Sequence, residues 1–502
     1  MPLRLVALNL LIIFSDMSQF KKENSYTNII KRISSFGGIQ VFNILINLIR
    51  GKFVALLLGP EGMGISSLFT SSTNTIQQLS GLGLNLAIVK EVAAHKDNEG
   101  RLSQILAIAL RLILFTSILG AVACVILSPL LSKWSFGSYD YTLSFIFLSA
   151  GVALTVGGTG YLALLQGLGE VKRFSKASIV GGLTGLFGGV PMYYFWGDKG
   201  IVPAIVLLAL TTFIFYFFSL KKTFSIEKTS ISYTQHKPLI RRLIALGLIL
   251  MTGSVAGTLS SYLINIFIRN FGSVDNVGLF QAANSITNQY VGIVFSALAL
   301  DYFPRLSSIS SDLKKMNQVV NRQAEIVIVI ITPLIICLFL TTPWIIKILL
   351  AETFLPVSPL VKWLGMGVLL QGITFPLGYL YIANENRKLY FWLEIVVSNL
   401  LWITCSFVFY YFFSLVGLGI SLVVRTSLDI IITYLVCRKY YGFRYSSKTV
   451  IITFVCLLMG IGSFFLSLLP ESIYLVWLPV ILILSLIYSG YILFAGIRES
   501  RD

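Results

Sequence analysis

The dominant pattern along the chain is a series of long apolar stretches separated by short polar turns. Fourteen stretches have the length of a membrane-spanning helix, because about 20 residues cross the ~30 Å hydrocarbon core of a bilayer. They are continuously apolar rather than alternating, which favours helices over membrane strands. We therefore expect an all-α polytopic membrane protein with about 14 transmembrane helices. The stretches lie near 34–58, 64–89, 104–131, 142–167, 177–197, 201–220, 240–268, 276–304, 322–350, 356–382, 389–412, 414–437, 449–469 and 474–496.

Composition excludes a soluble protein. Of the 502 residues 56% are hydrophobic and only 12% are charged, whereas soluble chains carry about 25% charged residues. The net charge of +17 could indicate nucleic acid, but most cations lie in short turns and no basic stretch is interleaved with exposed aromatic residues. The five cysteines have no CxxC spacing, so we expect neither a disulfide nor a metal site.

The basic residues indicate how the chain crosses the membrane. If the N-terminus lies in the cytoplasm, 29 of the 38 Lys and Arg residues fall in the cytoplasmic segments and five fall on or beside the outside turns. Cytoplasmic loops carry an excess of Lys and Arg. The bias places both termini in the cytoplasm, as an even number of helices requires, and the bacterial inner membrane is the expected location.

The chain also repeats itself over a distance of 211 residues. Leu68-Phe69 precede Gln78 and Gly81, and Leu279-Phe280 precede Gln289 and Gly292 in the same way. An interval of 211 residues holds six spans, so both copies enter the membrane from the same side. We expect two parallel six-helix lobes around a central cavity, plus two extra C-terminal helices.

The expected domains follow from this repeat. They are a cytoplasmic N-terminal segment (1–27), an N-lobe (28–220), a cytoplasmic linker (221–239), a C-lobe (240–437), and the last two helices with a cytoplasmic tail (438–502). The apolar run 5–14 is too short to span a bilayer and has no cleavage site after it. We expect translation to begin at Met17, which would leave residues 1–16 untranslated.

Polar side chains form stripes on four of the predicted spans. Spacings of three and four residues place them on one helix face. Small polar groups often form hydrogen bonds between membrane helices, but four stripes on repeat-related helices favour a water-filled cavity between the lobes. The amides proposed to line it are Gln40, Asn43, Asn47, Asn74, Gln281, Asn284 and Asn288.

Charged residues inside the spans extend this interpretation, since each lone charge at mid-membrane costs about 2.5–3.5 kcal/mol. Arg50 lies on the same stripe as Asn47, and Lys52 joins it only if Gly51 distorts the helix. With Arg111, these cations suit an anionic cargo such as a pyrophosphate, and the arginine fork matches phosphate oxygens.

The remaining membrane charges have other expected roles. Arg425 and Asp429 are one turn apart and form a structural ion pair in this interpretation. Glu394 is a candidate coupling site for H⁺ or Na⁺, or else a partner of Arg425. No other cofactor and no metal are expected. Catalytic motifs such as a Walker lysine, GxSxG or HExxH are absent from the sequence. The glycines of 181–189 are more typical of close helix packing than of a nucleotide loop.

Several segments resemble a known family. The best is the Gly-Pro-x-Gly-x-Gly turn at 59–64 after Lys52. Further similar segments are Gly81-Leu-Gly83 through Ala87, Lys90 and His95-Lys-Asp97, then Gln166-Gly167-Leu168, and Tyr390 to Glu394 after Asn384-Glu385-Asn386. Across 28–437 the chain resembles the Wzx-type O-antigen and lipid-linked oligosaccharide flippases of the multidrug/oligosaccharidyl-lipid/polysaccharide exporter superfamily.

The resemblance implies two six-helix lobes around a cavity lined by the first two helices of each. It implies transport of undecaprenyl-diphosphate-linked oligosaccharide, an O-antigen or other surface polysaccharide unit, to the periplasmic leaflet by alternating access. The expected partners are that lipid, the bilayer and other polysaccharide assembly proteins, with no nucleic acid. Two alternatives remain open: a drug or metabolite antiporter of the same superfamily, and an integral-membrane polysaccharide polymerase.

Overall fold

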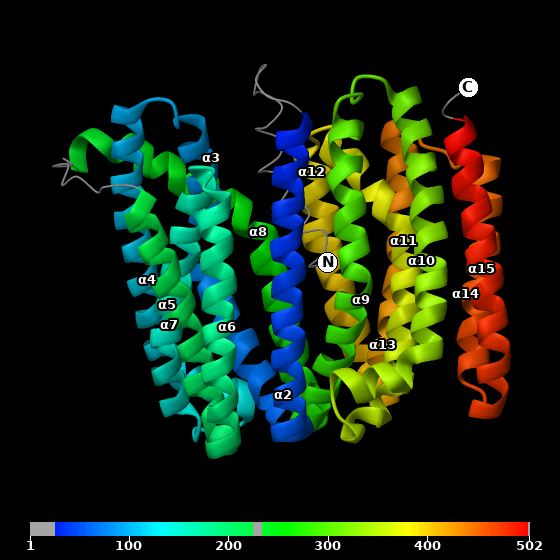
Figure 1. The fold of residues 1–502 in the computed structure, drawn as a ribbon, viewed down its shortest axis with the longest axis horizontal. Helices are drawn as coiled ribbons and strands as arrows, with labels where there is room; N and C mark the ends of the chain where they lie inside the picture. Colours follow the sequence, from blue (N-terminus) through cyan, green and yellow to red (C-terminus); the bar gives the residue numbers. More distant parts are fainter. Residues whose placement is uncertain (1–25, 224–232, 500–502) are drawn as a thin grey trace. The chain divides into compact units, whose positions relative to one another are not determined.

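The computed structural model is helical throughout (Figure 1). It describes the backbone of residues 26–223 and 233–499, and their side chains apart from 26–41, 99, 233–236, 288–290, 293, 300, 301 and 497–499. The expected start at Met17 and residues 224–232 of the expected linker lie outside the described residues. The chain divides into two compact units, an N-terminal unit of residues 1–278 and a C-terminal unit of residues 279–502.

The N-terminal unit contains the first eight elements and the start of the ninth. They are α2 (Tyr26–Ser80), α3 (Leu84–Ala94), α4 (Glu99–Phe136), α5 (Thr142–Gly167), α6 (Val171–Trp196), the 3₁₀ helix η2 (Gly197–Gly200), α7 (Ile201–Thr223), α8 (Tyr233–Phe271) and α9 (Val274–Ser307). The boundary between the units falls inside α9, after Gly278.

The C-terminal unit contains the rest of α9 and the remaining elements. They are α10 (Leu313–Leu349), the 3₁₀ helix η3 (Glu352–Val357), α11 (Ser358–Ala383), α12 (Arg387–Tyr390), the π-helix η4 (Phe391–Val397), α13 (Ser398–Tyr441), α14 (Ser447–Ser467) and α15 (Glu471–Glu499). Both α14 and α15 pack on α10, so the two helices predicted outside the repeat belong to this unit.

Ten stretches within the described residues are long and apolar enough to cross a membrane. Three of them contain a break. Gly59 has non-helical angles (φ 66°, ψ −163°) inside α2, η2 separates α6 from α7, and Ser414 interrupts α13 (φ 50°, ψ −137°). The protein is therefore an integral membrane protein with many spans.

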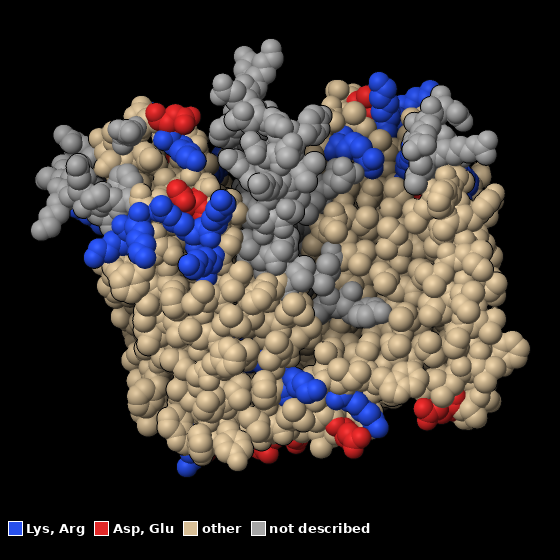
Figure 2. All heavy atoms as spheres, viewed as in Figure 1, with Lys and Arg blue, Asp and Glu red and all other residues tan. Residues whose placement is uncertain are grey.

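Turns expected on the same side of the membrane meet within the N-terminal unit. At one end, Gly137 after α4 lies against the Arg269 guanidinium of α8. At the other end, Arg173 of α6 donates a hydrogen bond to Thr223 of α7 (2.6 Å). In Figure 2 the visible charged side chains of each unit lie towards its helix ends and leave an uncharged band between them. This is the pattern that a bilayer imposes on helix surfaces.

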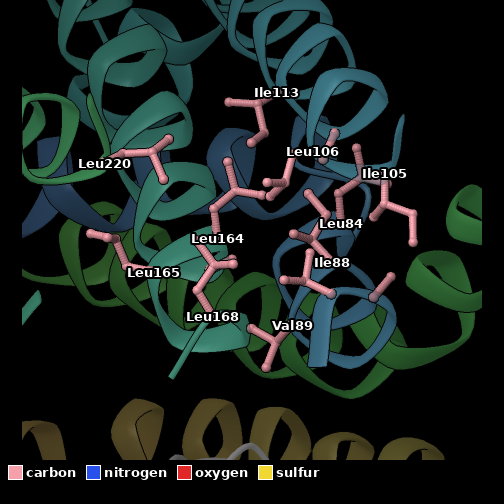
Figure 3. Packing of buried hydrophobic residues seen from close by; sticks show 14 of the residues in the cluster. Leu84, Ile88, Val89, Ile105, Leu106, Ile113, Leu164, Leu165, Leu168 and Leu220 are labelled. Carbon is pink, nitrogen blue, oxygen red and sulfur yellow. The ribbon is translucent and has the colours of Figure 1, made fainter. Parts of the chain in front are cut away.

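A core of aliphatic side chains fixes the N-terminal unit near the start of α3. Leu84 and Ile88 of α3, Ile105 of α4 and Leu164 of α5 are almost fully buried against one another, and Figure 3 shows these side chains converging. Glycines allow the neighbouring helices to approach closely. A Cβ on Gly181 of α6 would lie 2.8 Å from the Thr212 Cα of α7, which confirms the glycine row as a packing face.

One predicted span differs from the structure. The stretch 64–89 was expected to be continuous, but the chain breaks after Ser80, and Leu82 and Gly83 adopt positive φ angles of 49° and 61°. The cause is packing against α8: a Cβ on Gly83 would overlap the carbonyl oxygen of Gly247. Only a glycine fits this approach at a left-handed position, so α3 starts afresh at Leu84.

Candidate functional site

Of the polar residues along the first half of α2, one contacts a neighbouring helix and another is exposed at the surface. Asn43 accepts a hydrogen bond from Ser178 of α6 (Oγ–Oδ1 3.3 Å), so this amide joins two helices. Asn47, one turn later, is exposed. An exposed amide is costly against lipid, which favours an aqueous surface at Asn47. The side chain of Gln40 lies outside the described residues.

Arg50 continues this face of α2. Its side chain is half-buried and interacts electrostatically with the hydroxyl of Tyr193 in α6. Arg50 lies nine residues before the break at Gly59, or about 13.5 Å at 1.5 Å per residue. Arg50 therefore lies on the stripe, in the half of the span that leads to the Gly59 turn.

The second half of α2 shows the same division. Ser67 accepts a hydrogen bond from the buried Asn265 of α8 (Nδ2–Oγ 3.4 Å), so a polar contact joins this half of α2 to α8. Asn74, two turns further along, is exposed. Hydrogen bonds between helices therefore account for some polar residues in each half of α2. They do not account for the exposed amides Asn47 and Asn74.

The predicted amides of α9 are partly buried where their side chains are described. Gln281 and Asn284 are half-buried, and Asn284 takes part in a polar interaction. The side chain of Asn288 lies outside the described residues.

The other two predicted cations occupy different surfaces of the N-terminal unit. The first half of α2 is helical through Gly51, so Lys52 lies about 200° around the helix from Arg50. Arg111 is exposed on α4, about 18 Å along the axis from Glu99. Both side chains take part in polar or electrostatic interactions.

Glu394 lies in a buried cluster of polar groups in the C-terminal unit. The carboxylate is 6% exposed and accepts a hydrogen bond from the Tyr381 hydroxyl of α11. Asn399 of α13 donates to the Glu394 backbone carbonyl oxygen (3.4 Å). Glu394 belongs to the π-helix η4, and such short π segments occur frequently at functional sites.

Arg425 contacts Ser398, which lies one helical turn after Glu394. Its guanidinium is buried, donates a hydrogen bond to the Ser398 hydroxyl (3.2 Å) and lies over the Trp402 ring at 5.4 Å. Asp429 accepts a hydrogen bond from Thr433 (3.4 Å). Both Arg425 and Asp429 have further interactions.

Sequence reasoning missed two polar groups. Tyr381 was counted as part of an apolar span, although it and Glu394 lie on either side of the turn at 384–386. Glu91 of α3 was also missed. It is 3% exposed, and its carboxylate is 3.6 Å from the Arg242 guanidinium of α8. It also lies 3.7 Å from the ring of His95.

Comparison with known proteins then identifies the family. A family model described as polysaccharide biosynthesis protein matches residues 53–359, more than half of the chain. The chain belongs to this polysaccharide biosynthesis protein family. The match confirms the resemblance found at the Gly59–Gly64 turn and ends before α12, so the Glu394 site and α14–α15 lie beyond it.

Relatives of this family member are named as transporters. The chain is 24% identical over 355 residues to the lipid III flippase of Escherichia coli (strain K12), covering 70% of this chain and 85% of that protein. It is 21% identical over 311 residues to a Shigella flexneri protein whose name proposes O-antigen transport, covering 60% of this chain and 72% of that protein.

Solved structures agree on the fold. An inward-facing multidrug resistance transporter of the MATE family and the MOP superfamily covers 80% of this chain and 94% of its own, at 17% identity and a TM-score of 0.67. The lipid II flippase MurJ in an inward closed conformation covers 93% and 99%, at 13% identity and a TM-score of 0.69. This polysaccharide biosynthesis family member therefore has the fold of these MOP superfamily transporters.

Proposed function

We propose that the chain is a flippase that moves undecaprenyl-diphosphate-linked oligosaccharide, an O-antigen or other surface polysaccharide unit, from the cytoplasmic to the periplasmic leaflet by alternating access. The observation that carries the proposal is the match to 85% of the length of the lipid III flippase from Escherichia coli, within a family of polysaccharide biosynthesis proteins. Other proteins of polysaccharide assembly are its expected partners.

The proposed architecture has fourteen spans in two six-helix lobes around a central cavity, followed by α14 and α15. The three breaks at Gly59, η2 and Ser414 each divide one membrane-length stretch into two. The 34-residue helix α9 supplies a further span. The domain limits 28–220 and 240–437 remain part of this proposal.

We place both termini in the cytoplasm and the chain in the bacterial inner membrane. The charge bias supports this orientation. The order of crossings agrees with a contact between turns in the C-terminal unit, where Asn321 of α10 donates a hydrogen bond to the carbonyl oxygen of Arg444, which lies between α13 and α14 (3.0 Å). Both segments lie on the cytoplasmic side in the proposed topology.

The cargo site is proposed on the polar faces of α2 and α9. Arg50 would bind the diphosphate through its planar fork, with Lys52 and Arg111 as further cations. The exposed amides Asn47 and Asn74 would contact the water-filled path. The amides Gln40, Asn43, Gln281, Asn284 and Asn288 complete the proposed lining, and Arg425 and Asp429 stabilise the C-terminal unit.

Energy for directional transport is proposed to come from H⁺ or Na⁺ at Glu394. The support is local chemistry: a buried carboxylate with a hydroxyl donor, in a π-helix, within a membrane-length stretch. Carboxylates in this setting are typical of ion relays in transporters.

Deletion in the organism that encodes the chain tests the function. We expect loss of surface polysaccharide and accumulation of lipid-linked oligosaccharide on the cytoplasmic side, with both restored by the wild-type chain. Restored surface glycan without any change in the lipid-linked intermediate would contradict flipping. Susceptibility to cationic drugs is measured in parallel, since a drug antiporter would change that property and leave the glycan intact.

A further inference from the structure

A separate cavity lies entirely within the C-terminal unit. It has a volume of about 650 Å³ and opens between the first turns of α10, the segment that joins α13 to α14, and the last turns of α15. This size is sufficient for a small-molecule ligand or headgroup. The cavity contains neither Glu394 nor any of the amides proposed for the cargo, so it is a second site.

Basic side chains dominate the cavity. Its described lining residues include four cations, Lys314, Arg322, Arg444 and Lys448, and one carboxylate, Glu325. Glu325 accepts a hydrogen bond from the Thr449 hydroxyl (2.6 Å), so the wall itself occupies one of its lone pairs. With all five groups ionised the cavity carries a charge of +3, which favours an anion.

One further carboxylate lies close by and has its own partners. Asp312 caps α10 by accepting hydrogen bonds from the amides of Lys314 and Lys315 (both 3.1 Å). Its carboxylate is 3.5 Å from the Lys315 ammonium. The backbone hydrogen bond from Lys315 lowers the pKa of Asp312, so it stays ionised, and the positive charge of Lys315 offsets it.

The cavity is held in shape by hydrogen bonds between segments far apart in the sequence. Asn321 of α10 is 8% exposed and bridges to the loop: it donates to the Arg444 carbonyl oxygen (3.0 Å) and accepts from the Ser446 amide (2.8 Å). Arg322 donates to the Gly496 carbonyl oxygen of α15 (2.6 Å). A guanidinium has five donors, so Arg322 can bind a second acceptor at the same time.

Helix dipoles add to this charge. Both α10 and α14 begin at the cavity, and the N-terminal end of a helix carries a partial positive charge that favours anions. Ser446 caps α14 by accepting from the Thr449 amide (3.1 Å). Because Asp312 already caps α10, the start of α14 and the four cations are the main positive groups at the cavity.

The opposite wall is apolar and continues into the lipid-facing surface. Ile326, Ile492 and Leu493 line the cavity. Beside them on α15, Tyr491 and Phe494 are 70% and 79% exposed, within a membrane-length stretch. A ligand here meets phosphate-binding groups at one end and the hydrocarbon-facing surface of α15 at the other.

We propose that this cavity binds the headgroup of an anionic phospholipid from the adjacent leaflet, with the phosphate among the four cations and the acyl chains along α15. Basic pockets between membrane helices are typical sites for anionic lipid headgroups. The match to the family model ends at residue 359, so it does not include the cavity residues of the α13–α14 segment and of α15. The site does not depend on the proposed flippase function.

The test measures lipid binding to the purified full-length chain by native mass spectrometry, with phosphatidylglycerol and phosphatidylethanolamine as probes. The Arg444→Ala/Lys448→Ala double variant removes two cavity cations and leaves the backbone bonds of Arg444 in place. The matched control is Lys388→Ala/Lys439→Ala, which removes two exposed cations outside the cavity lining in the same unit.

Each cation removed at a membrane surface weakens anionic lipid binding about fivefold, so the cavity variant should bind phosphatidylglycerol roughly 25-fold more weakly than wild type. The control variant should match wild type, and phosphatidylethanolamine should bind weakly to all three. Equal binding of phosphatidylglycerol by the cavity variant and the control would overturn the proposal.

A second experiment with inorganic phosphate distinguishes binding of a lipid from binding of a soluble anion. Phosphate added to wild-type protein in neutral detergent should leave the melting temperature unchanged, whereas phosphatidylglycerol should raise it in wild type and control but not in the cavity variant. Equal stabilisation by inorganic phosphate would show that the cavity takes a soluble anion, and the lipid proposal would fail. The cavity variant must melt like wild type in phosphatidylethanolamine, which excludes misfolding.

Discussion

At the scale of single residues, Arg50 is the group on which the cargo proposal depends most. It shares a helix face with Asn43 and Asn47, and the Asn43 bond to Ser178 fixes that face towards α6. The Tyr193 hydroxyl lies within electrostatic reach of the guanidinium. In the proposed mechanism, a cation at this depth would stabilise a diphosphate that enters from water, whereas it has no comparable use against lipid.

Arg50→Ala should insert and fold but transport poorly. Loss of charge-assisted hydrogen bonds to phosphate costs about 1.5–3 kcal/mol, or roughly a 10- to 150-fold slower transport rate. Arg50→Lys should recover only part of the rate, because an ammonium keeps the charge and loses the two-pronged fit. The readouts are surface glycan and cytoplasmic-side lipid-linked intermediate.

Lys133→Ala is the matched control for Arg50, since it removes an exposed cation from the last turn of α4 in the same unit. It should export normally. Full export by Arg50→Ala at normal protein level would remove Arg50 from the mechanism and leave Lys52 and Arg111 as the next cations to test.

Glu394→Gln should abolish ion-driven transport if the carboxylate is the coupling site. The amide keeps the size of the side chain and can still accept the hydrogen bond from Tyr381, but it cannot bind and release a proton. Transport by reconstituted vesicles with and without a pH or sodium gradient measures this. Gradient dependence equal to wild type would reject coupling at Glu394 and favour the alternative, a structural partnership with Arg425.

At the scale of helices, the Gly59–Gly64 turn shows why the motif needs its glycines. A Cβ on Gly64 of α2 would overlap the Val274 carbonyl oxygen, and a Cβ on Gly278 of α9 would overlap that of Pro60. The two helices approach backbone to backbone at both points. A larger residue on either helix would push the two backbones apart, so small residues are required on each helix.

Gly64→Ala should therefore destabilise the protein by about 1–3 kcal/mol through overpacking. The measurement is thermal melting of the purified protein in one detergent. Gly51→Ala in the same helix is the control, because a Cβ there meets nothing within 4 Å. It should be neutral or stabilise by about 0.5–1 kcal/mol, since alanine favours a helix over glycine. Equal melting temperatures for the two variants would contradict the close approach.

How far the sequence predicts this structure depends on the length scale of each feature. Hydropathy predicts the membrane helices, and the Gly59-Pro60 pair predicts a turn. The break at Leu82 and Gly83 escapes hydropathy because an average over 18 or more residues cannot detect two positive φ angles. The hydrogen bond between Tyr381 and Glu394 could be predicted only from how the helices on either side of the connecting turn face each other. The basic cavity escaped because Arg322, Arg444 and Gly496 come from segments more than 50 residues apart.

At the scale of the whole molecule, the topology is the first property to establish. Fusions of a reporter active only in the periplasm should be silent after Tyr233 and Ser446 and active after Ser138 and Ser273. The reason is the bias of 29 Lys and Arg residues against five. Activity after Tyr233 would contradict the fourteen-span topology with both termini in the cytoplasm.

Transport of the lipid by the purified chain is the most direct test of the central claim. The lipid-linked oligosaccharide that accumulates in the deletion strain is extracted, incorporated with the protein into vesicles and exposed to periodate, which oxidises only the glycans on the outer surface. We predict that wild-type protein brings the inner pool to the outer surface, with a rate that Arg50→Ala reduces at least tenfold. The contradicting result is oxidation of the initial outer pool alone, as in protein-free vesicles. It would have to occur with folded wild-type protein present and with an ion gradient of either direction.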